Sequence, residues 1–190
     1  IWNLVFMQYD RDESGKMTPL PNPCIDTGMG LERLSAVVQG KITNYDSDLM
    51  IGLIHEIAKT VGKPYGQTPS ADVSMRVLAD HARAVTFLIG DGVLPSNEGR
   101  GYVLRRILRR ALRHGKRLGK NEPFFHLITD QVVERFNETY PELESHHAFI
   151  KRVVINEEEN FGNTLTYGIQ RLDEIIERLK KNNQTVIPGD

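Results

Sequence analysis

The chain has 190 residues, a formal net charge of −1, 39% hydrophobic residues and 26% charged residues. These values are ordinary for a soluble globular protein of one domain or two small ones, and the net charge alone gives no sign of a nucleic-acid partner. The single cysteine, Cys24, excludes an internal disulfide and a cysteine zinc cluster, and no apolar run or signal peptide indicates a membrane partner, so we expect a cytoplasmic protein.

The first quarter of the chain predicts two strands followed by a helix. Residues 2–9 are rich in apolar, aromatic and β-branched side chains and predict a strand. Residues 10–16 carry a turn signal, and residues 17–25 are punctuated by prolines that exclude a helix, so we expect a hairpin-like pair of extended segments. A turn at Gly28-Met29-Gly30 and a helix over residues 31–39, ended by Gly40, are expected next.

The rest of the chain predicts helices almost throughout. A helix begins at Asp46 or Ser47 and runs to about Val61, and a proline- and glycine-containing stretch over residues 63–69 follows. We therefore expect two domains, 1–66 and 67–190. The second has helical spacing over residues 73–89, 101–118, 123–140 and from 141 to about 181, with a loop at 93–99. In the last helix an apolar stripe is predicted from Phe161 to Leu179. The expected fold class is α+β, mostly α.

The residues around the two glycines predict a binding site. Asp26 lies just before them and Arg33 one turn into the following helix. A strand, a glycine turn and a helix N-terminus suit a bound anion. Two alternatives are a purely structural turn and a dinucleotide-binding turn. The second fits poorly, because Arg33 stands where the third glycine of that motif is needed.

A row of cations marks the helix predicted at residues 101–118. No acidic residue occurs between Arg100 and Lys120. One face should be exposed and arginine-lined, and the buried stripe should comprise Val103, Leu104, Ile107, Leu108, Ala111 and Leu112. A solvated face normally mixes signs, so this helix predicts RNA phosphate binding, with an ordinary solvated face as the alternative. The RNA-binding candidates here are Arg100, Arg105, Arg106, Arg109, Arg110, Arg113 and Arg117.

The run Asp-Thr-Gly-Met-Gly-Leu-Glu-Arg-Leu at 26–34 resembles the third signature motif of class II aminoacyl-tRNA synthetases, in the form found in the alanyl-tRNA synthetase family. Residues 1–9, 76–81 and 94–106 also resemble segments of that family, in the same order. The resemblance spans essentially the whole chain and is weakest beyond Lys120. It implies an internal segment in which 1–66 is the C-terminal part of the aminoacylation domain and 67–190 an incomplete helical tRNA-recognition domain.

The resemblance also implies roles for the residues near the glycines. Asp26 would bind the α-amino group of alanine, and Asn3, Val5 and Gly28 would line the same pocket. Arg33, with Gly30, would meet the phosphates of ATP, which brings Mg²⁺ as its metal. No side chain would act as nucleophile or base, because positioning and charge are sufficient for this transfer. We expect no metal site in this chain; in the family, zinc belongs to a separate editing domain.

The resemblance assigns one further residue to RNA. Asn97 would read the G·U wobble pair in the acceptor stem of tRNA(Ala), together with an aspartate expected beyond Asp190. The implied partners are tRNA(Ala), alanine, ATP and the remainder of the same polypeptide. We expect the parent protein to be an alanine–tRNA ligase and the 190 residues alone to be inactive. The alternative is a non-catalytic helical RNA-binding module that retains a synthetase-like turn.

Overall fold

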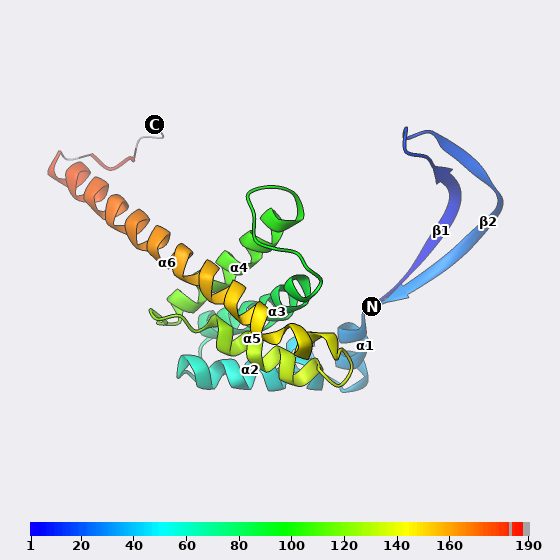
Figure 1. Ribbon diagram of the computed structural model, residues 1–190, viewed down its shortest axis with the longest axis horizontal. Helices are drawn as coiled ribbons and strands as arrows, with labels where there is room; N and C mark the ends of the chain where they lie inside the picture. The colour runs from blue at the N-terminus through cyan, green and yellow to red at the C-terminus, as the bar shows by residue number, and fades with distance from the viewer. Residues whose placement is uncertain (183, 188–190) are drawn as a thin grey trace. The chain divides into compact units, whose positions relative to one another are not determined.

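The computed structural model describes residues 1–182 and 184–187 (Figure 1). The described residues form two strands, a short 3₁₀ helix and six α-helices, which confirms the expected α+β, mostly α class. Contacts divide the chain into two compact units, Ile1–Gly52 and Leu53–Asp190. The domain boundary between residues 66 and 67 stays a prediction.

The first unit begins with the expected antiparallel hairpin. Strand β1 covers Trp2–Arg11 and β2 covers Met17–Met29. The turn between them closes through Gly15, whose positive φ of 86° suits a residue without a side chain. The prolines of β2 are accommodated because a two-stranded sheet leaves one edge of each strand unpaired. Apolar side chains are exposed on both strands, including Trp2, Phe6 and Ile25.

The expected turn at Gly28-Met29-Gly30 is wrong. Strand β2 continues through Met29, and Gly30, with φ −71° and ψ 121°, is still extended where it caps helix α1, Leu31–Val38. The chain therefore passes from strand to helix without a left-handed residue. The glycines make room for neighbouring side chains instead of reversing the chain.

The end of the first unit contains the start of the helix that the sequence predicts near Asp46 or Ser47. After α1 come the 3₁₀ helix η1, Asn44–Asp46, and helix α2, Asp48–Val61, which crosses the boundary between the units. Ser47 precedes α2, and its carbonyl accepts from the N–H groups of Met50 and Ile51, as expected of a helix start. Gln39 reaches Asp48 through two side-chain hydrogen bonds, which tie the end of α1 to the start of α2.

The second unit contains four further helices, of which three pack around the fourth, α3 (Figure 1). They are α3 Pro69–Gly90, α4 Gly99–Arg117, α5 Phe125–Phe136 and α6 Glu142–Lys181. Helix α3 begins four residues before the predicted start because Pro69 occupies the first helical position, where its missing N–H costs nothing. Helix α5 is shorter than predicted at both ends. The core includes Leu78, Val85, Leu104, Leu108, Ile128, Val132, Ile150 and Val154.

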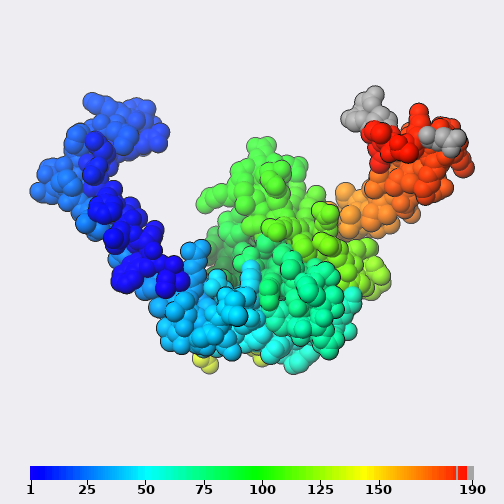
Figure 2. Space-filling view, turned by 180° about the vertical axis from the view of Figure 1, so that it is seen from behind, coloured from blue at the N-terminus to red at the C-terminus, as the bar shows by residue number. Residues whose placement is uncertain are grey.

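Helix α6 is as long as predicted, but its predicted apolar stripe is packed only in part, since Leu179 is buried while other members are exposed. Leu143, Ile150 and Val154 are buried, whereas Ile169 and Leu172 are exposed and Phe161 is half-buried. The second half of α6, orange to red, runs clear of the other helices of its unit in both views (Figures 1 and 2). Helical spacing predicted the helix correctly but not which of its turns meet a partner. Within the described residues, no helix is long and apolar enough to cross a membrane.

Candidate functional site

One face of the hairpin brings together four of the predicted site residues. Asn3 pairs with Gly28 and Val5 with Asp26 in the strand register. Directly opposed residues share a face, and so do residues two apart on one strand. A methyl group on Gly28 would lie 3.1 Å from the Asn3 side-chain oxygen, a tight approach that favours glycine. The face therefore presents a carboxylate, an amide and an apolar wall next to bare backbone.

Hydrogen bonds of Thr27, on the opposite face of the hairpin, stabilise the strand register at this end. Thr27 accepts a hydrogen bond from the indole nitrogen of Trp2 and donates one to the Asn3 carbonyl at 2.9 Å. The Thr27 N–H donates to Asp26 Oδ1 at 2.7 Å, which orients that carboxylate. Because a slip of one residue would turn every side chain to the other face, these bonds hold Asp26 beside Val5.

The start of α1 places Gly30 under the stem of Arg33. A methyl group on Gly30 would lie 3.3 Å from Arg33 Cδ, so the glycine gives the arginine room to fold back over the helix N-terminus. Arg33 is exposed. Its fixed positive charge and the positive end of the helix dipole both favour an anion.

Helix α4 presents the predicted arginine face. Its exposed residues include four arginines at four-three-four spacing: Arg106, Arg110, Arg113 and Arg117. Arg100, near the N-terminus of the same helix, is exposed as well. Burial and the charges of Arg117 and Arg110 together lower the pKa of His114 on the same helix. The surface is therefore locally cationic on a chain that is nearly neutral overall.

The predicted buried stripe of α4 is wrong at Val103, which is 54% exposed. Leu104, Leu108, Ala111 and Leu112 are buried as expected, but so are Gly101 and Gly115. A methyl group on Gly115 would overlap the Phe124 ring, and one on Gly101 would overlap the Leu94 carbonyl. Because the buried side of α4 includes the two glycines, it is turned away from Val103. A pattern of apolar side chains could not predict this, since glycine has no side chain to contribute to it.

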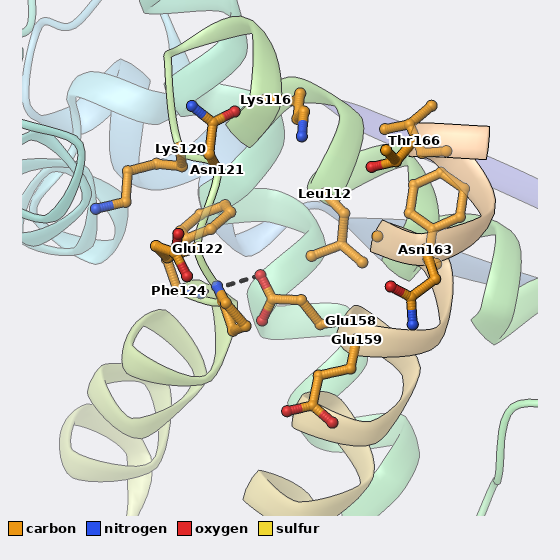
Figure 3. Close-up of a pocket in the computed structure, with 14 residues that line it drawn as sticks. Leu112, Lys116, Lys120, Asn121, Glu122, Phe124, Glu158, Glu159, Asn163 and Thr166 are labelled. Atoms are coloured by element: carbon orange, nitrogen blue, oxygen red, sulfur yellow. Dashed lines mark hydrogen bonds between the residues drawn. The ribbon is translucent and has the colours of Figure 1, made fainter. Parts of the chain in front are cut away.

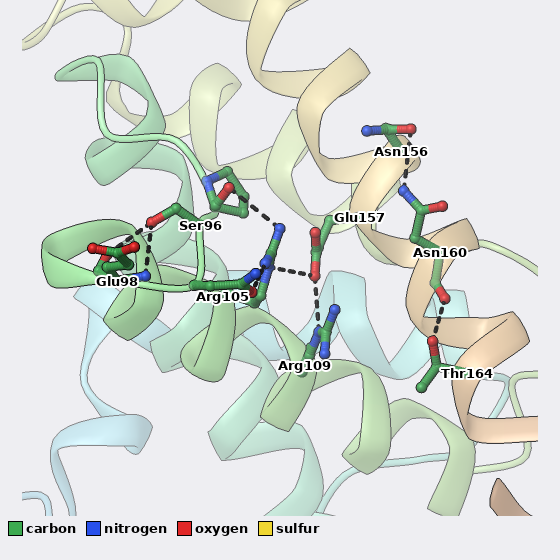
Figure 4. A network of polar contacts seen from close by, with 10 residues as sticks. Ser96, Glu98, Arg105, Arg109, Asn156, Glu157, Asn160 and Thr164 are labelled. Atoms are coloured by element: carbon green, nitrogen blue, oxygen red, sulfur yellow. Dashed lines mark hydrogen bonds and ion pairs between the residues drawn. The ribbon is translucent and has the colours of Figure 1, made fainter.

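Arg105 and Arg109 differ from the exposed row because both meet Glu157 of α6 (Figure 4). Arg109 Nε donates to Glu157 Oε1 at 2.8 Å, and its guanidinium lies over the Phe161 ring, 5.2 Å from the centroid. Arg105 Nε lies 3.1 Å from the same oxygen in an ion pair without hydrogen-bond geometry. Their side chains are only 22% and 35% exposed. These two predicted RNA contacts therefore have protein partners.

The same Arg105 also forms two hydrogen bonds to the loop before α4. Its Nη1 donates to Asn97 Oδ1 at 2.5 Å, and its Nη2 donates to the Pro95 carbonyl at 3.3 Å. A guanidinium has donors only, so the amide oxygen of Asn97 must face Arg105 and the amide NH₂ group is directed elsewhere. Asn97 is exposed. The amide NH₂ group of Asn97, a hydrogen-bond donor, is thus held at the surface beside the exposed arginines of α4.

Asp80 and His81 lie against the same helix. His81 Nδ1 and Asp80 Oδ2 are 2.9 Å apart, and this bond, with the charges of His81, Arg83 and Arg110, holds the pKa of Asp80 below its usual value. His81 is buried and lines a shallow hollow of about 430 Å³ with Val103, Arg106, Ile107, Arg109 and Arg110. The pair adds a carboxylate to the edge of the arginine face.

A second hollow of about 390 Å³ lies between the end of α4, the segment before α5, and α6 (Figure 3). On its wall the Glu158 carboxylate accepts hydrogen bonds from the N–H groups of Phe124 at 3.0 Å and Phe125 at 3.1 Å, and so caps α5 from another helix. Burial raises the pKa of Glu158 to about 7, although these two bonds favour its ionised form.

Sequence reasoning missed both Glu157 and Glu158. They lie in the run Asn-Glu-Glu-Glu-Asn, which reads as a solvated face, and their partners are more than 30 residues away. The absence of an acidic residue within the cationic helix could have indicated that its arginines need a partner such as Glu157 from elsewhere in the chain. Within the described part of the chain, no three His, Cys, Asp or Glu side chains gather as a metal site would require.

Comparison with known proteins gives one consistent result. A family model described as tRNA synthetases class II (A) matches residues 1–190. The alanine–tRNA ligase of Desulfosudis oleivorans is 55% identical over 189 residues, and that of Caldicellulosiruptor saccharolyticus is 51% identical over 189. The alanine–tRNA ligase of Fusobacterium nucleatum is 50% identical over 190 residues. Each match covers the whole of this chain but 22% of the relative.

Proposed function

The chain belongs to the class II (A) tRNA synthetases, and on that premise we propose that it is part of an alanine–tRNA ligase. That enzyme activates alanine with ATP and Mg²⁺ to alanyl-adenylate and transfers the alanyl group to tRNA(Ala). The gathering of Asn3, Val5, Asp26 and Gly28 on one face of the hairpin supports this proposal most directly. We place the activity in the cytoplasm, where an exposed thiol such as that of Cys24 stays reduced.

In the proposed alanine site the hairpin face supplies one wall. The Asp26 carboxylate accepts a charge-assisted hydrogen bond from the ammonium group of alanine. Val5, its strand partner, contacts the methyl group, and Gly28 and Asn3 complete the wall. Arg33 neutralises charge on the phosphates of ATP as the alanine carboxylate attacks the α-phosphorus, and Gly30 gives its side chain room. Zinc belongs to an editing domain outside these residues, and the 190-residue chain alone does not form the adenylate.

Replacing Asp26 tests the alanine site. In the full-length ligase, Asp26→Asn should raise KM for alanine in alanine-dependent pyrophosphate exchange by about tenfold or more, because an amide cannot neutralise the ammonium. KM for ATP should change little. Asp10→Asn is the matched control, since Asp10 pairs with Thr18 near the far end of the same hairpin and is exposed. An unchanged KM for alanine in Asp26→Asn would remove Asp26 from the site.

In the proposed RNA site, α4 and the loop before it bind the acceptor stem. The exposed arginines Arg106, Arg110, Arg113 and Arg117 contact backbone phosphates, which position the stem without reading its sequence. Asn97 reads the G·U pair in the minor groove. Because its amide oxygen already accepts from Arg105, Asn97 acts as a donor toward acceptor atoms of the base pair. The amino group of the guanine then needs an acceptor from another residue.

Removing the Asn97 amide tests this assignment. In the full-length ligase, Asn97→Ala should lower the ratio of kcat/KM for G·U over G·C acceptor stems by about tenfold or more, the effect of losing one specific base contact. Asn121→Ala, a change of the same kind at an exposed position between α4 and α5, should keep the ratio. An unchanged ratio in Asn97→Ala would make Asn97 a turn residue only.

A further inference from the structure

Glu157 is a buried carboxylate that neither proposed site uses. Its side chain is 6% exposed, and a buried charge is tolerated only when it is paired. Both of its partners, Arg105 and Arg109, come from α4, while Glu157 itself lies on α6 (Figure 4). The ion pairs therefore join two helices at the level where the Asn97 loop reaches α4.

The guanidinium of Arg105 connects this carboxylate to the loop. One edge faces Glu157 Oε1, with Nε at 3.1 Å, and the other two nitrogens donate to Asn97 Oδ1 and the Pro95 carbonyl. The guanidinium is planar and rigid, so the attraction between Glu157 and its Nε edge favours the orientation in which its other donors point at the loop. A change at Glu157 is thus transmitted to the Asn97 amide through one side chain.

We propose that Glu157 is a positioning residue for Asn97. It holds the Arg105 guanidinium in the orientation that binds the amide oxygen of Asn97, so that the amide NH₂ group is presented to the minor groove. The proposal rests on the proposed reading of the G·U pair by Asn97 and assigns Arg105 to the loop instead of to RNA phosphate.

The division between the buried and exposed arginines makes this proposal distinct from general phosphate binding. Arg105 has its donors directed at protein acceptors, whereas Arg106 and Arg110 are exposed. Loss of the Glu157 charge should therefore alter discrimination between base pairs and leave the electrostatic part of RNA binding in place. That electrostatic part is measured by the dependence of affinity on salt.

The test is Glu157→Gln in the full-length ligase, because glutamine keeps the size and removes the charge. The ratio of kcat/KM for G·U over G·C stems should fall by about tenfold, since a misplaced donor loses its base contact. The slope of log affinity against log salt should stay that of the wild type. Glu159→Gln, the same change at an exposed position two residues along α6, should keep both values.

A double variant separates positioning from a general loss of structure. In the Asn97→Ala background, Glu157→Gln should lower the G·U preference no further, because the group that it positions is absent. A further drop of similar size would overturn the proposal. Arg105→Lys is the second variant: it keeps the charge, loses the planar fork and should reproduce the loss of preference with an unchanged salt slope.

The results distinguish this inference from the function on which it rests. If Asn97→Ala leaves the G·U preference unchanged, the proposed reading by Asn97 fails. If Asn97→Ala lowers the preference while both Glu157→Gln and Arg105→Lys keep it, Asn97 reads the pair without help from α6 and the positioning role is wrong.

Discussion

Two neighbouring carboxylates on α6 have different kinds of partners. Glu157 faces two guanidinium groups, whereas Glu158 faces only the N–H groups of Phe124 and Phe125. Two backbone N–H groups do not offset the desolvation of the Glu158 carboxylate. Burial accordingly raises the pKa of Glu158 to about 7, so this carboxyl group should titrate near neutral pH.

Glu158 predicts a pH dependence of stability. Between its ordinary pKa of 4.5 and its folded pKa of about 7, the native carboxyl group keeps a proton that the unfolded chain has lost. Rising pH through this window therefore lowers the free energy of unfolding, by at most about 3 kcal/mol. Glu158→Gln cannot titrate and its amide oxygen can still accept from the backbone, so the variant should gain stability relative to the wild type as pH rises.

Urea denaturation of both proteins between pH 5 and pH 8 measures this difference. The difference in free energy of unfolding should grow up to about pH 7 and then level off. Parallel pH profiles of wild type and Glu158→Gln would show that the native carboxyl group is ionised at its ordinary pKa.

Whether the contacts of a residue could be predicted from the sequence depends on how near its partner lies along the chain. The hairpin signal and the family resemblance were enough to place Asn3 and Asp26 near one another, because the strands are adjacent in sequence. The Glu157–Arg109 contact spans 48 residues and two helices. No pattern within α4 or α6 specifies which acidic residue of one meets which arginine of the other.

At the scale of elements, the glycines of α4 determine how it packs. Gly101 faces the loop that holds Asn97, where a methyl group would overlap the Leu94 carbonyl and approach the Ser96 side chain. Backbone atoms cannot move aside as easily as the end of a side chain. The close packing of helix on loop brings Arg105 within reach of Pro95 and Asn97.

Gly101→Ala should destabilise the chain by about 1–3 kcal/mol, because overpacking outweighs the better helix propensity of alanine. Gly162→Ala is the matched control on α6, where a methyl group meets nothing within 4 Å. That variant should be more stable than the wild type by up to about 1 kcal/mol. Thermal denaturation measures the change in stability of both variants. A Gly101→Ala chain as stable as the Gly162→Ala chain would mean that the loop moves aside without loss of stability.

Element types were predictable from the sequence, while their packing was only partly so. Apolar spacing predicted all the helices of the second unit, and prolines and glycines placed most of their ends within a few residues. The same spacing predicted a packed stripe along the second half of α6, yet Ile169 and Leu172 are exposed. Periodicity shows which side of a helix is apolar; what covers that side depends on distant residues.

At the scale of the whole molecule, the two units carry different parts of the proposed function. The hairpin of the first unit exposes apolar side chains on both faces, and a two-stranded sheet is marginal by itself. The helices of the second unit have a continuous buried core. We therefore expect the proposed RNA binding by the second unit to be measurable with the 190-residue chain, and we expect adenylate formation only from the longer ligase.

We expect the exposed face of α4 to bind RNA phosphate, and the dependence of affinity on salt concentration reports on such contacts. The measurement is the dissociation constant of the 190-residue chain for an acceptor-stem hairpin RNA across a series of KCl concentrations. Four phosphate contacts predict a slope of log affinity against log salt of about −3. Arg106→Glu with Arg110→Glu should abolish binding at physiological salt, because two attractive contacts become repulsive.

The control is Arg171→Glu with Lys180→Glu, which changes the net charge equally on α6, away from the arginine face. This control should keep a steep salt slope while the α4 variant loses binding. Equal affinities and equal salt slopes for the two double variants would rule out phosphate binding by the α4 face, since RNA would then respond to net charge alone.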